Sequence, residues 1–290
     1  MNFLENVDRK KLQTTLIAII SVLTVIALGL FLVIIIASVS DGISDSFGDT
    51  ELKEYNVTDK DLATGSLILA DADHSYTPNE EYLGLVKCAE YMAAQPDATG
   101  IDPKDYALMN YIPWTAMRLS ESAMAEAHKM LTAAKKAVGD DPITIDGAYD
   151  VIYHSEKLPE FKTALLIYLS DFNSTGEVRA HLSDAYRAWL DQNAADYGFV
   201  KSFEDGYRFV GIPHAKYMDS KELSLADYIA YLKENTNCDK ALKITAGSTQ
   251  YAVYYYSCNN VGDTVKVPAE GAYTISGTNE GGVIVTFEIK

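Results

Sequence analysis

The sequence predicts an α+β fold that is preceded by one apolar helix and followed by a β-rich extension. Three observations lead to this prediction. One long segment has the i, i+3, i+4 spacing of an amphipathic helix, several short apolar segments lie between turn residues, and residues 237–290 contain strand-like segments only. The chain has 290 residues, 48% of them hydrophobic, which suffices for one or two packed domains.

The composition excludes several classes of protein. The net charge is −17, with 24 Lys and Arg against 41 Asp and Glu, so a nucleic-acid-binding protein is not expected. There is no GxGxxG segment and no P-loop, so nucleotide binding is not expected either. The three cysteines form no CxxC pair, which argues against a cysteine-based zinc site.

Residues 16–37 predict a membrane anchor. They contain no charged residue, and as a helix they would be roughly 33 Å long, enough to cross a bilayer. Arg9, Lys10 and Lys11 precede this span and acidic residues follow it, so residues 1–15 are expected in the cytoplasm and the main domain outside. The alternative is a signal peptide cleaved near ASVS (37–40), a weak cleavage sequence.

The next elements follow in order along the chain. Residues 38–62 are polar and predict a stalk. GSLILADADHSY (65–76) predicts a short strand and a turn, and residues 80–94 predict a helix. Residues 119–138 predict a long helix that ends at Gly139, because five residues share one apolar face: Met124, Ala127, Leu131, Ala134 and Val138.

Strands and helices alternate in the second half. ITIDGAY (143–149) and TALLIYL (163–169) predict strands, the second covered on both faces because it is apolar throughout. Ser183 and Ser224 predict the caps of two further helices. The remaining predicted strands are RFVGI (208–212), YAVYYY (251–256), TVKVP (264–268) and GGVIVTFEIK (281–290). Cys238 and Cys258 are the better candidates for a disulfide, which an oxidising exterior would permit.

Five segments, taken in order, resemble a known family. They are GSLILADADHSY (65–76), the helix at 119–138, AYRAWLDQNAADYGFV (185–200), YRFVGIPHAKYM (207–218) and LSLADYIAYLKE (223–234). Together they resemble the zinc D-alanyl-D-alanine carboxypeptidases of the VanY type. The resemblance implies a carboxypeptidase-like domain over residues 63–236, with a central antiparallel sheet and flanking helices. The tail, residues 237–290, is similar to the C-terminal extension of some membrane-anchored members.

The resemblance also implies where a metal site would lie. In that family a His, an Asp seven residues later and a second His hold zinc, and a Glu two residues before the second His is the general base. The family's first motif corresponds to PEFKTALLIY (159–168), with Phe161 at the His and Tyr168 at the Asp position. The second corresponds to FEDG (203–206), with Phe203 at the base and Gly206 at the second His position.

The substrate-binding arginine of the family is absent as well. It belongs to a Gly-Tyr-Arg turn, which corresponds to GAY (147–149) here. Phe and Gly side chains offer zinc no lone pair, and Tyr is an uncommon ligand. We therefore expect a family member with no catalytic residues and no cofactor, whose remnant cleft lies at these substituted positions.

A rebuilt zinc site is the alternative. Its candidate ligands are His154, Glu156, Glu204 and Asp205, which lie near the old site in sequence. His214 and His128 are interpreted instead as structural residues.

The expected function follows from both arguments. The protein is predicted to be a membrane-anchored, extracytoplasmic pseudoenzyme that binds a peptidoglycan stem peptide or a cell-wall protein through the remnant cleft. With a rebuilt site it would instead be an active zinc D,D-carboxypeptidase that trims stem peptides. A third possibility is an assembly role for the β-rich tail, residues 240–290.

Overall fold

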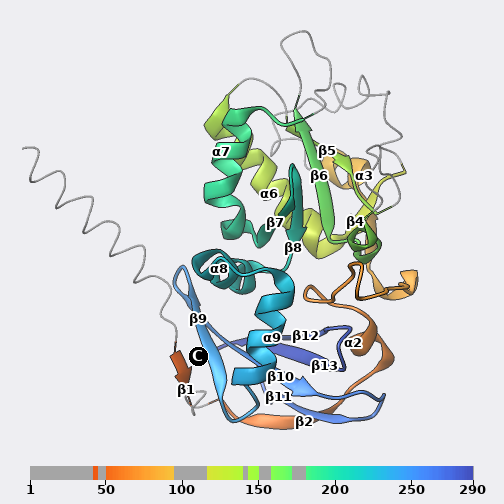
Figure 1. Cartoon of the computed structure of the whole chain (residues 1–290), viewed down its shortest axis with the longest axis vertical. Helices are drawn as coiled ribbons and strands as arrows, with labels where there is room; N and C mark the ends of the chain where they lie inside the picture. The colour runs from red at the N-terminus through yellow and green to blue at the C-terminus, as the bar shows by residue number, and fades with distance from the viewer. Residues whose placement is uncertain are drawn as a thin grey trace, which may run out of the picture. The chain divides into compact units, whose positions relative to one another are not determined.

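The computed structural model describes residues 42–44, 50–94, 116–139, 143–149, 158–171 and 181–289. They belong to one compact unit, Asp41–Lys290, in which helices are combined with antiparallel sheets (Figure 1). This agrees with the predicted α+β class. No helix in these ranges is long and apolar enough to cross a membrane, and the predicted anchor at 16–37 lies outside them.

The described helical elements include three short 3₁₀ turns, labelled η. They are α2 Asp59–Ala63, η1 Glu80–Tyr82, α3 Cys88–Ala93, α6 Glu121–Val138, η2 Pro159–Thr163, α7 Asp184–Asn193, η3 Ala194–Tyr197, α8 Ile212–Lys221 and α9 Leu225–Asn235. The described strands are β1 Gly42–Ser44, β2 Leu52–Asn56, β3 Leu85–Lys87, β4 Arg118–Ser120, β5 Ile143–Gly147, β6 Leu166–Asp171, β7 Phe199–Phe203, β8 Gly206–Phe209, β9 Ala241–Ala246, β10 Thr249–Ser257, β11 Thr264–Pro268, β12 Tyr273–Gly277 and β13 Gly282–Glu288.

The central sheet has four antiparallel strands in the order β5-β6-β8-β7. Helices α6 and α7 lie beside it in Figure 1, and their apolar faces share one core with alternate residues of the strands. Ile167 and Leu169 of β6 belong to this core, whereas Leu166 and Tyr168 belong to a separate cluster. Strand β6 is thus buried along its whole length, as its apolar sequence predicted.

Helix α6 is capped at both ends, and it ends at Gly139 as its sequence predicted. The Ser120 hydroxyl accepts a hydrogen bond from the Ala123 amide at 3.3 Å, and Gly139, with φ 124°, ends the helix. Six apolar residues of one face are buried: Ala123, Met124, Ala127, Met130, Leu131 and Ala134. The long amphipathic helix is therefore confirmed.

A second sheet, in the order β1-β9-β10-β13-β12, carries the C-terminal region. One face shares an apolar core with α8 and α9, and the other packs against β11 and its partner β2. Tyr255 belongs to the first core and Tyr254 to the second, so both faces of β10 are covered. Residues 237–290 and the carboxypeptidase-like region thus have a hydrophobic core in common.

Part of the segment expected as a stalk, residues 38–62, forms strands. Strand β1 pairs with β9 in the second sheet, and β2 pairs with β11 along five residues in a separate two-stranded sheet. Thr58 caps α2, where its hydroxyl accepts from the Asp61 amide and the Asp61 carboxylate accepts from the Thr58 amide at 2.8 Å. A polar composition did not prevent pairing here, because strand pairing uses backbone groups that every residue but Pro supplies.

The strand predicted within residues 65–76 is absent. Leu67, Ile68 and Leu69 are buried, but their backbone groups bond to scattered partners instead of to a neighbouring strand. The carbonyls of Ser66 and Ile68 both accept from Nη2 of Arg208, at 3.3 and 3.1 Å. The apolar run therefore indicates that the segment is buried. A buried strand and a buried loop that is held by hydrogen bonds have the same sequence pattern.

Two further expectations differ from the structure. The helix predicted over residues 80–94 is divided into η1, the strand β3 and the short helix α3, because β3 pairs with β4. The disulfide between Cys238 and Cys258 is not formed. These two cysteines are free thiols.

Arg208 is the most deeply buried basic side chain in the described part of the chain, with 1% of its surface exposed. Its guanidinium also donates to Glu160 at 3.3 Å, so it joins strand β8 to η2 and to the loop at 66–68. We predict that Arg208→Met destabilises the protein by about 3–5 kcal/mol, since the Glu160 carboxylate and two carbonyls lose their donor. Urea unfolding measures this difference.

The matched control is Lys129→Met, which removes an exposed ion pair with Glu126 on α6. That change should alter the unfolding free energy by no more than about 0.5 kcal/mol. Similar effects of the two substitutions would contradict the proposed role of Arg208.

His74 joins the loop after residue 70 to the turn between β12 and β13. Its ring nitrogens lie 2.7 Å from Asp71 and 3.1 Å from Glu280. The hydrogen bond to Asp71 raises the pKa of His74 above its ordinary value of 6.5, and the hydrogen bond to Glu280 raises it further. The charged form is thus favoured in the folded protein.

A pH-dependent stability follows. Because the folded pKa lies above 6.5, the contribution of His74 is complete below pH 6.5 and is lost as pH rises through the folded pKa. We predict that His74→Gln lowers the unfolding free energy by about 1 kcal/mol or less at pH 5.5, and by a smaller amount at pH 9. Denaturant unfolding of both proteins at several pH values measures this. A difference that does not vary with pH would refute it.

Candidate functional site

The four positions that the resemblance assigned to the metal site lie close together in the structure. Phe161 is in η2, Tyr168 in β6, Phe203 at the end of β7 and Gly206 at the start of β8. In the strand ladder, Gly206 is the register partner of both Tyr168 and Phe203. These neighbouring elements therefore hold the four residues on one face of the central sheet.

Three of these residues form a cluster of aromatic rings. The centroids of Phe161 and Phe203 are 6.4 Å apart in an edge-to-face arrangement, and those of Tyr168 and Phe203 are 6.1 Å apart and stacked. Phe161 and Tyr168 are buried, while Phe203 is half-buried. A Cβ atom added to Gly206 would collide with the ring of Phe203. We call Phe161, Tyr168 and Phe203 the ring cluster.

Local backbone features place the ring cluster. The ladder between β7 and β8 has a register shift between Lys201 and Phe203, and such a bulge turns the following side chain to the other face. Asp205, with φ 60°, then makes the tight turn into β8. Ala164 has φ 58°, a left-handed conformation that glycine adopts more readily than alanine.

The ring cluster does not fit a zinc ion. The two phenylalanine rings and Gly206 offer no lone pair, so only Tyr168 has a possible donor atom. Burial, followed by the charge of Asp205, raises the pKa of Tyr168 to about 12, so its hydroxyl remains protonated at neutral pH. A protonated phenol is a poor zinc ligand, and the cluster is an apolar contact between three segments.

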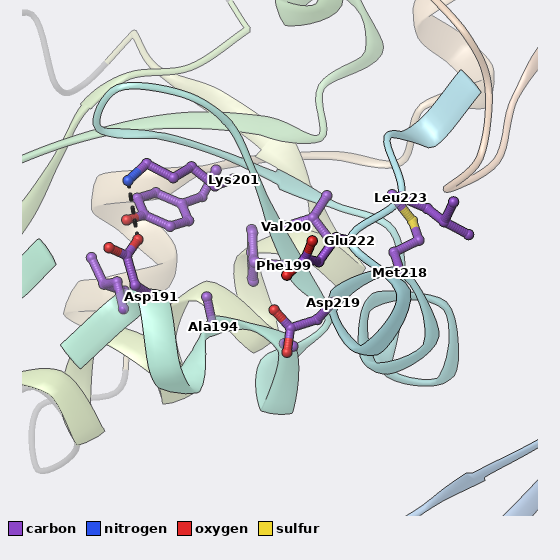
Figure 2. A pocket seen from close by; sticks show the side chains of 12 residues that line it. Asp191, Ala194, Phe199, Val200, Lys201, Met218, Asp219, Glu222 and Leu223 are labelled. Atoms are coloured by element: carbon purple, nitrogen blue, oxygen red, sulfur yellow. Dashed lines mark hydrogen bonds and ion pairs between the residues drawn. The ribbon is translucent and has the colours of Figure 1, made fainter. Parts of the chain in front are cut away.

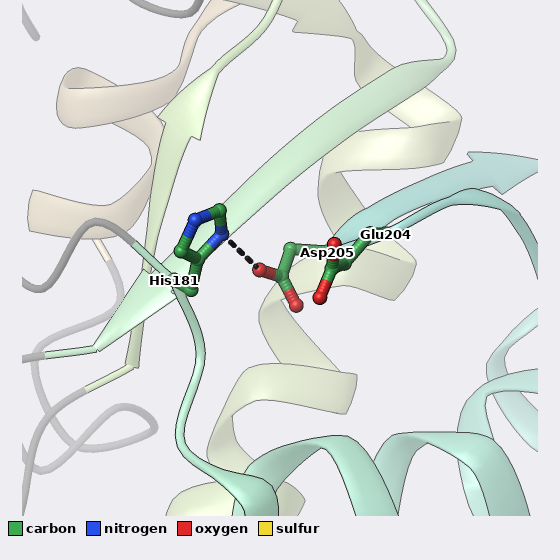
Figure 3. Close-up of side chains that lie close together, drawn as sticks. All are labelled: His181, Glu204 and Asp205. Atoms are coloured by element: carbon green, nitrogen blue, oxygen red, sulfur yellow. Dashed lines mark hydrogen bonds and ion pairs between the residues drawn. The ribbon is translucent and has the colours of Figure 1, made fainter.

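A buried carboxylate with an arginine lies next to this cluster (Figure 3 shows Asp205 with two of its neighbours). Asp205 is 0% exposed and accepts from Nε of Arg187 at 2.7 Å and from Nη2 at 2.9 Å. It also accepts from the Leu182 amide at 3.3 Å and lies 3.2 Å from Nδ1 of His181. Burial alone would raise the pKa of Asp205, but these donors together hold it below its ordinary value.

His181, Glu204 and Asp205 are close enough to one another for a metal ion, with ligand atoms within 4.8 Å. Figure 3 shows the imidazole and the carboxylates approaching from two segments. The Arg187 guanidinium, however, binds both acids, with Nη2 lying 3.2 Å from Glu204. A cation would have to displace this guanidinium, so the three residues are better described as part of an arginine–carboxylate cluster.

The structure describes only two of the four residues proposed for a rebuilt zinc site. Of the four residues proposed from the sequence, Glu204 and Asp205 lie together, whereas His154 and Glu156 fall outside the described residues. His181 and Arg187 were not proposed, although both contact Asp205. No local motif marks them, because they lie 24 and 18 residues before Asp205 in the chain.

An arginine lies at the GAY turn, but it comes from another strand. The guanidinium of Arg118, in β4, is 5.3 Å from the centre of the Tyr149 ring. It also donates to Glu80 at 3.0 and 3.3 Å, and the Tyr149 hydroxyl donates to the same carboxylate at 3.0 Å. The GAY turn therefore lacks an arginine of its own, but Arg118 lies beside it and is bound to Glu80.

The structure supports the structural interpretation of two histidines. His214 is buried, with Nδ1 2.9 Å from the Tyr228 hydroxyl and Nε2 3.1 Å from Thr286. Burial lowers the pKa of His214 to about 3, so the ring is neutral. His128 is buried in α6 against Tyr91, and burial lowers its pKa as well.

Comparison with known proteins gives three results. No protein-family profile matches the chain. A D-alanyl-D-alanine carboxypeptidase from Enterococcus faecium is 32% identical over 111 residues, which is 34% of this chain and 35% of that protein. The chain thus matches about a third of the length of this curated relative.

Two solved structures are similar. The vancomycin-resistance D,D-dipeptidase VanXYg, in complex with a D-Ala-D-Ala phosphinate analogue, has a TM-score of 0.62 at 19% identity, covering 82% of this chain and 99% of that chain. The D,D-pentapeptidase VanY, in complex with Zn(II), has a TM-score of 0.33 at 16% identity, covering 39% of this chain and 84% of that chain.

The central antiparallel sheet, the helices on one of its faces and the similarity to VanXYg define the class of protein as a D,D-peptidase-like α+β fold. The sequence match, over about a third of the chain, is to a D-alanyl-D-alanine carboxypeptidase and agrees with the resemblance to the VanY-type enzymes.

The stability contributed by Asp205 depends on pH. Because its folded pKa is lowered, the contribution is present above the ordinary value of 3.8 and is lost as pH falls through the folded pKa. We predict that Asp205→Asn lowers the unfolding free energy by about 2–3 kcal/mol at pH 7 and by less at pH 3. Asp184→Asn, which changes a fully exposed acid near Arg187, is the control and should have little effect at either pH.

Proposed function

We propose that this protein is a non-catalytic member of the VanY-type D-alanyl-D-alanine carboxypeptidase family. It is held outside the membrane by an N-terminal helix, and it binds a peptidoglycan stem peptide or a protein of the cell-wall machinery. The single observation that carries the proposal is the ring cluster. Side chains that pack on one another stand at the positions where the resemblance implies zinc ligands and a general base.

The packing of the rings also opposes the return of metal ligands at these positions. A histidine at position 206 would overlap the Phe203 ring, so that ring has to move before a ligand can stand there. The rings also bury one another, and exchanging them for charged ligands would cost stability unless a metal neutralised those ligands. This arrangement favours a scaffold that persists without hydrolysis.

The proposed binding surface is the rim of the remnant cleft. Phe203 is half-buried and stacks on Tyr168, while the side chains of His181 and Glu204 are 60% and 67% exposed. An aromatic edge between a base and an acid can contact a short peptide through stacking and charge-assisted hydrogen bonds. Binding would then need no catalysis.

Metal content and peptidase activity test the proposal. We predict that the purified full-length protein, loaded with zinc and then desalted, retains well under one zinc per chain and releases no D-Ala from a peptide ending in D-Ala-D-Ala. The comparison is a variant with all four positions changed: Phe161→His, Tyr168→Asp, Phe203→Glu and Gly206→His. Replacing Phe203 makes room for the new histidine, so this variant should gain zinc if it folds, which circular dichroism reports.

One zinc per chain in the unmodified protein, together with release of D-Ala, would overturn the proposal. It would favour the second candidate function, an active zinc D,D-carboxypeptidase with a relocated site. The observation in favour of that candidate is the approach of His181, Glu204 and Asp205 within metal-binding distance. In that case His181→Ala and Glu204→Gln should both abolish zinc retention and activity.

A further inference from the structure

A pocket of about 340 Å³ lies where α7, η3, β7 and β8 meet the C-terminal end of α8. Figure 2 shows Asp191 and Lys201 on one side of it, and Asp219 and Glu222 on the other. Its volume is near the lower end for small-molecule sites, which is about 300–1,000 Å³. The residues that line it are Leu190, Asp191, Ala194, Ala195, Phe199, Val200, Lys201, Tyr207, Met218, Asp219, Glu222 and Leu223.

The pocket and the ring cluster are on opposite faces of the central sheet. Lys201 and Tyr207 are register partners and line the pocket, whereas Phe203 and Gly206 are register partners at the ring cluster. Successive residues of a strand point to opposite faces, so Tyr207 is directed away from Gly206. The pocket is therefore distinct from the remnant cleft.

The charges of the pocket are unbalanced. Three carboxylates, those of Asp191, Asp219 and Glu222, line it together with one ammonium group. Lys201 is paired with Asp191 at 3.0 Å. Within the described ranges, Asp219 and Glu222 have no ion-pair or hydrogen-bond partner for their carboxylates, which leaves two negative charges at the mouth of the pocket.

A neighbouring lysine on α8 is already paired. Lys216, one turn before Asp219 on α8, forms an ion pair with Asp196. Displacement of water by the surrounding protein raises the pKa of Asp219, and Asp196 raises it further, while Lys216 opposes them. A cation placed between Asp219 and Glu222 would relieve this unfavourable environment.

A second observation, independent of the acids, comes from Tyr207. Its side chain is 1% exposed and lines the pocket, and its hydroxyl has no hydrogen-bond partner in the described part of the chain. Leaving a buried hydroxyl unpaired costs about 1–3 kcal/mol. Native structures seldom tolerate this cost without a ligand or a water molecule to satisfy the group.

The remaining residues that line the pocket are apolar, and they determine which shape of ligand fits. Leu190, Ala194, Phe199 and Met218 are buried residues that form the wall between the acids and the core. An apolar wall beneath an acidic mouth is suited to an alkyl chain that ends in a positive charge. An anion would be repelled by the two unpaired acids, and a bare divalent ion would leave the apolar wall unused.

We propose that this pocket binds a primary alkylammonium group, with the charge held by Asp219 and Glu222 and the alkyl stem against the apolar wall. Such a group is available from a lysine side chain of a peptide or from a free diamine. In the bound state the Tyr207 hydroxyl is satisfied by the ligand or by a water molecule that the ligand orders. This inference goes beyond the proposed function, because it concerns the opposite face of the sheet.

Calorimetric titration of the full-length protein at pH 7 tests the proposal. One probe is Nα-acetyl-lysine methylamide, which represents a peptide side chain, and the other is 1,4-diaminobutane. Saturable binding of at least one amine is expected, and the tighter probe identifies the source. The Nε-acetylated form of the first probe has the same stem without the charge, and it should bind at least roughly tenfold more weakly.

Variants assign the binding to this pocket. Asp219→Asn combined with Glu222→Gln should weaken binding roughly tenfold or more, and Tyr207→Phe should weaken it by a smaller factor. Glu234→Gln combined with Glu270→Gln removes the same number of charges from exposed positions outside the pocket and should change affinity less than about twofold. A thermal melt checks that each variant is folded.

Several results would overturn the proposal. They are the absence of saturable binding of either amine, equal binding of the acetylated probe, equal effects of the two double variants, or tighter binding of calcium than of both amines at the same acids. Because the acetylated probe is tested on the unmodified protein, the outcome does not depend on any variant folding.

Discussion

The buried guanidinium of Arg208 connects the regions that make up this fold. It lies in β8, at the middle of the central sheet, and donates to Glu160 beside the ring cluster and to two carbonyls of the loop at 66–68. That loop is bonded in turn to the C-terminal sheet, because the Leu67 amide donates to Ser276 and the Leu69 amide to Thr278. A planar group with five fixed donors can join three segments in this way, whereas a lysine could not.

The ring cluster depends on this connection. Glu160 precedes Phe161 in η2, so the contact that holds Glu160 also fixes where the Phe161 ring lies. Burying two charges is unfavourable unless both are paired and hydrogen-bonded, and here the Ser202 hydroxyl also donates to Glu160, at 2.5 Å. The same few contacts thus connect the segments of the fold and hold the ring cluster in place.

The sequence predicted well where the determinants are local. Helix α6 ends at Gly139, and α9 is capped by Ser224, whose hydroxyl accepts from the Asp227 amide at 3.1 Å. The prediction of a strand failed at residues 65–70, where the hydrogen-bond partners of the backbone are more than a hundred residues away in the chain. The positions in the ring cluster came from a family resemblance, since no periodicity in residues 159–206 indicates that they meet. The contacts of Asp205 with Arg187 and His181 could not be predicted, because only the tertiary fold brings them together.

Arg187 explains how this region can be stable without a metal. A buried carboxylate such as Asp205 needs a positive charge nearby, and in a metallopeptidase the ion supplies much of that charge to the acids around it. Here the guanidinium provides two hydrogen bonds in a fixed plane and leaves His181 at the exposed side of the acid. A permanent cation of this kind needs no metal supply and no deprotonated ligand set, and it cannot polarise a peptide bond as a Lewis acid does. The Arg187 guanidinium therefore balances the buried charge of Asp205 without a metal ion, as the proposed non-catalytic function requires.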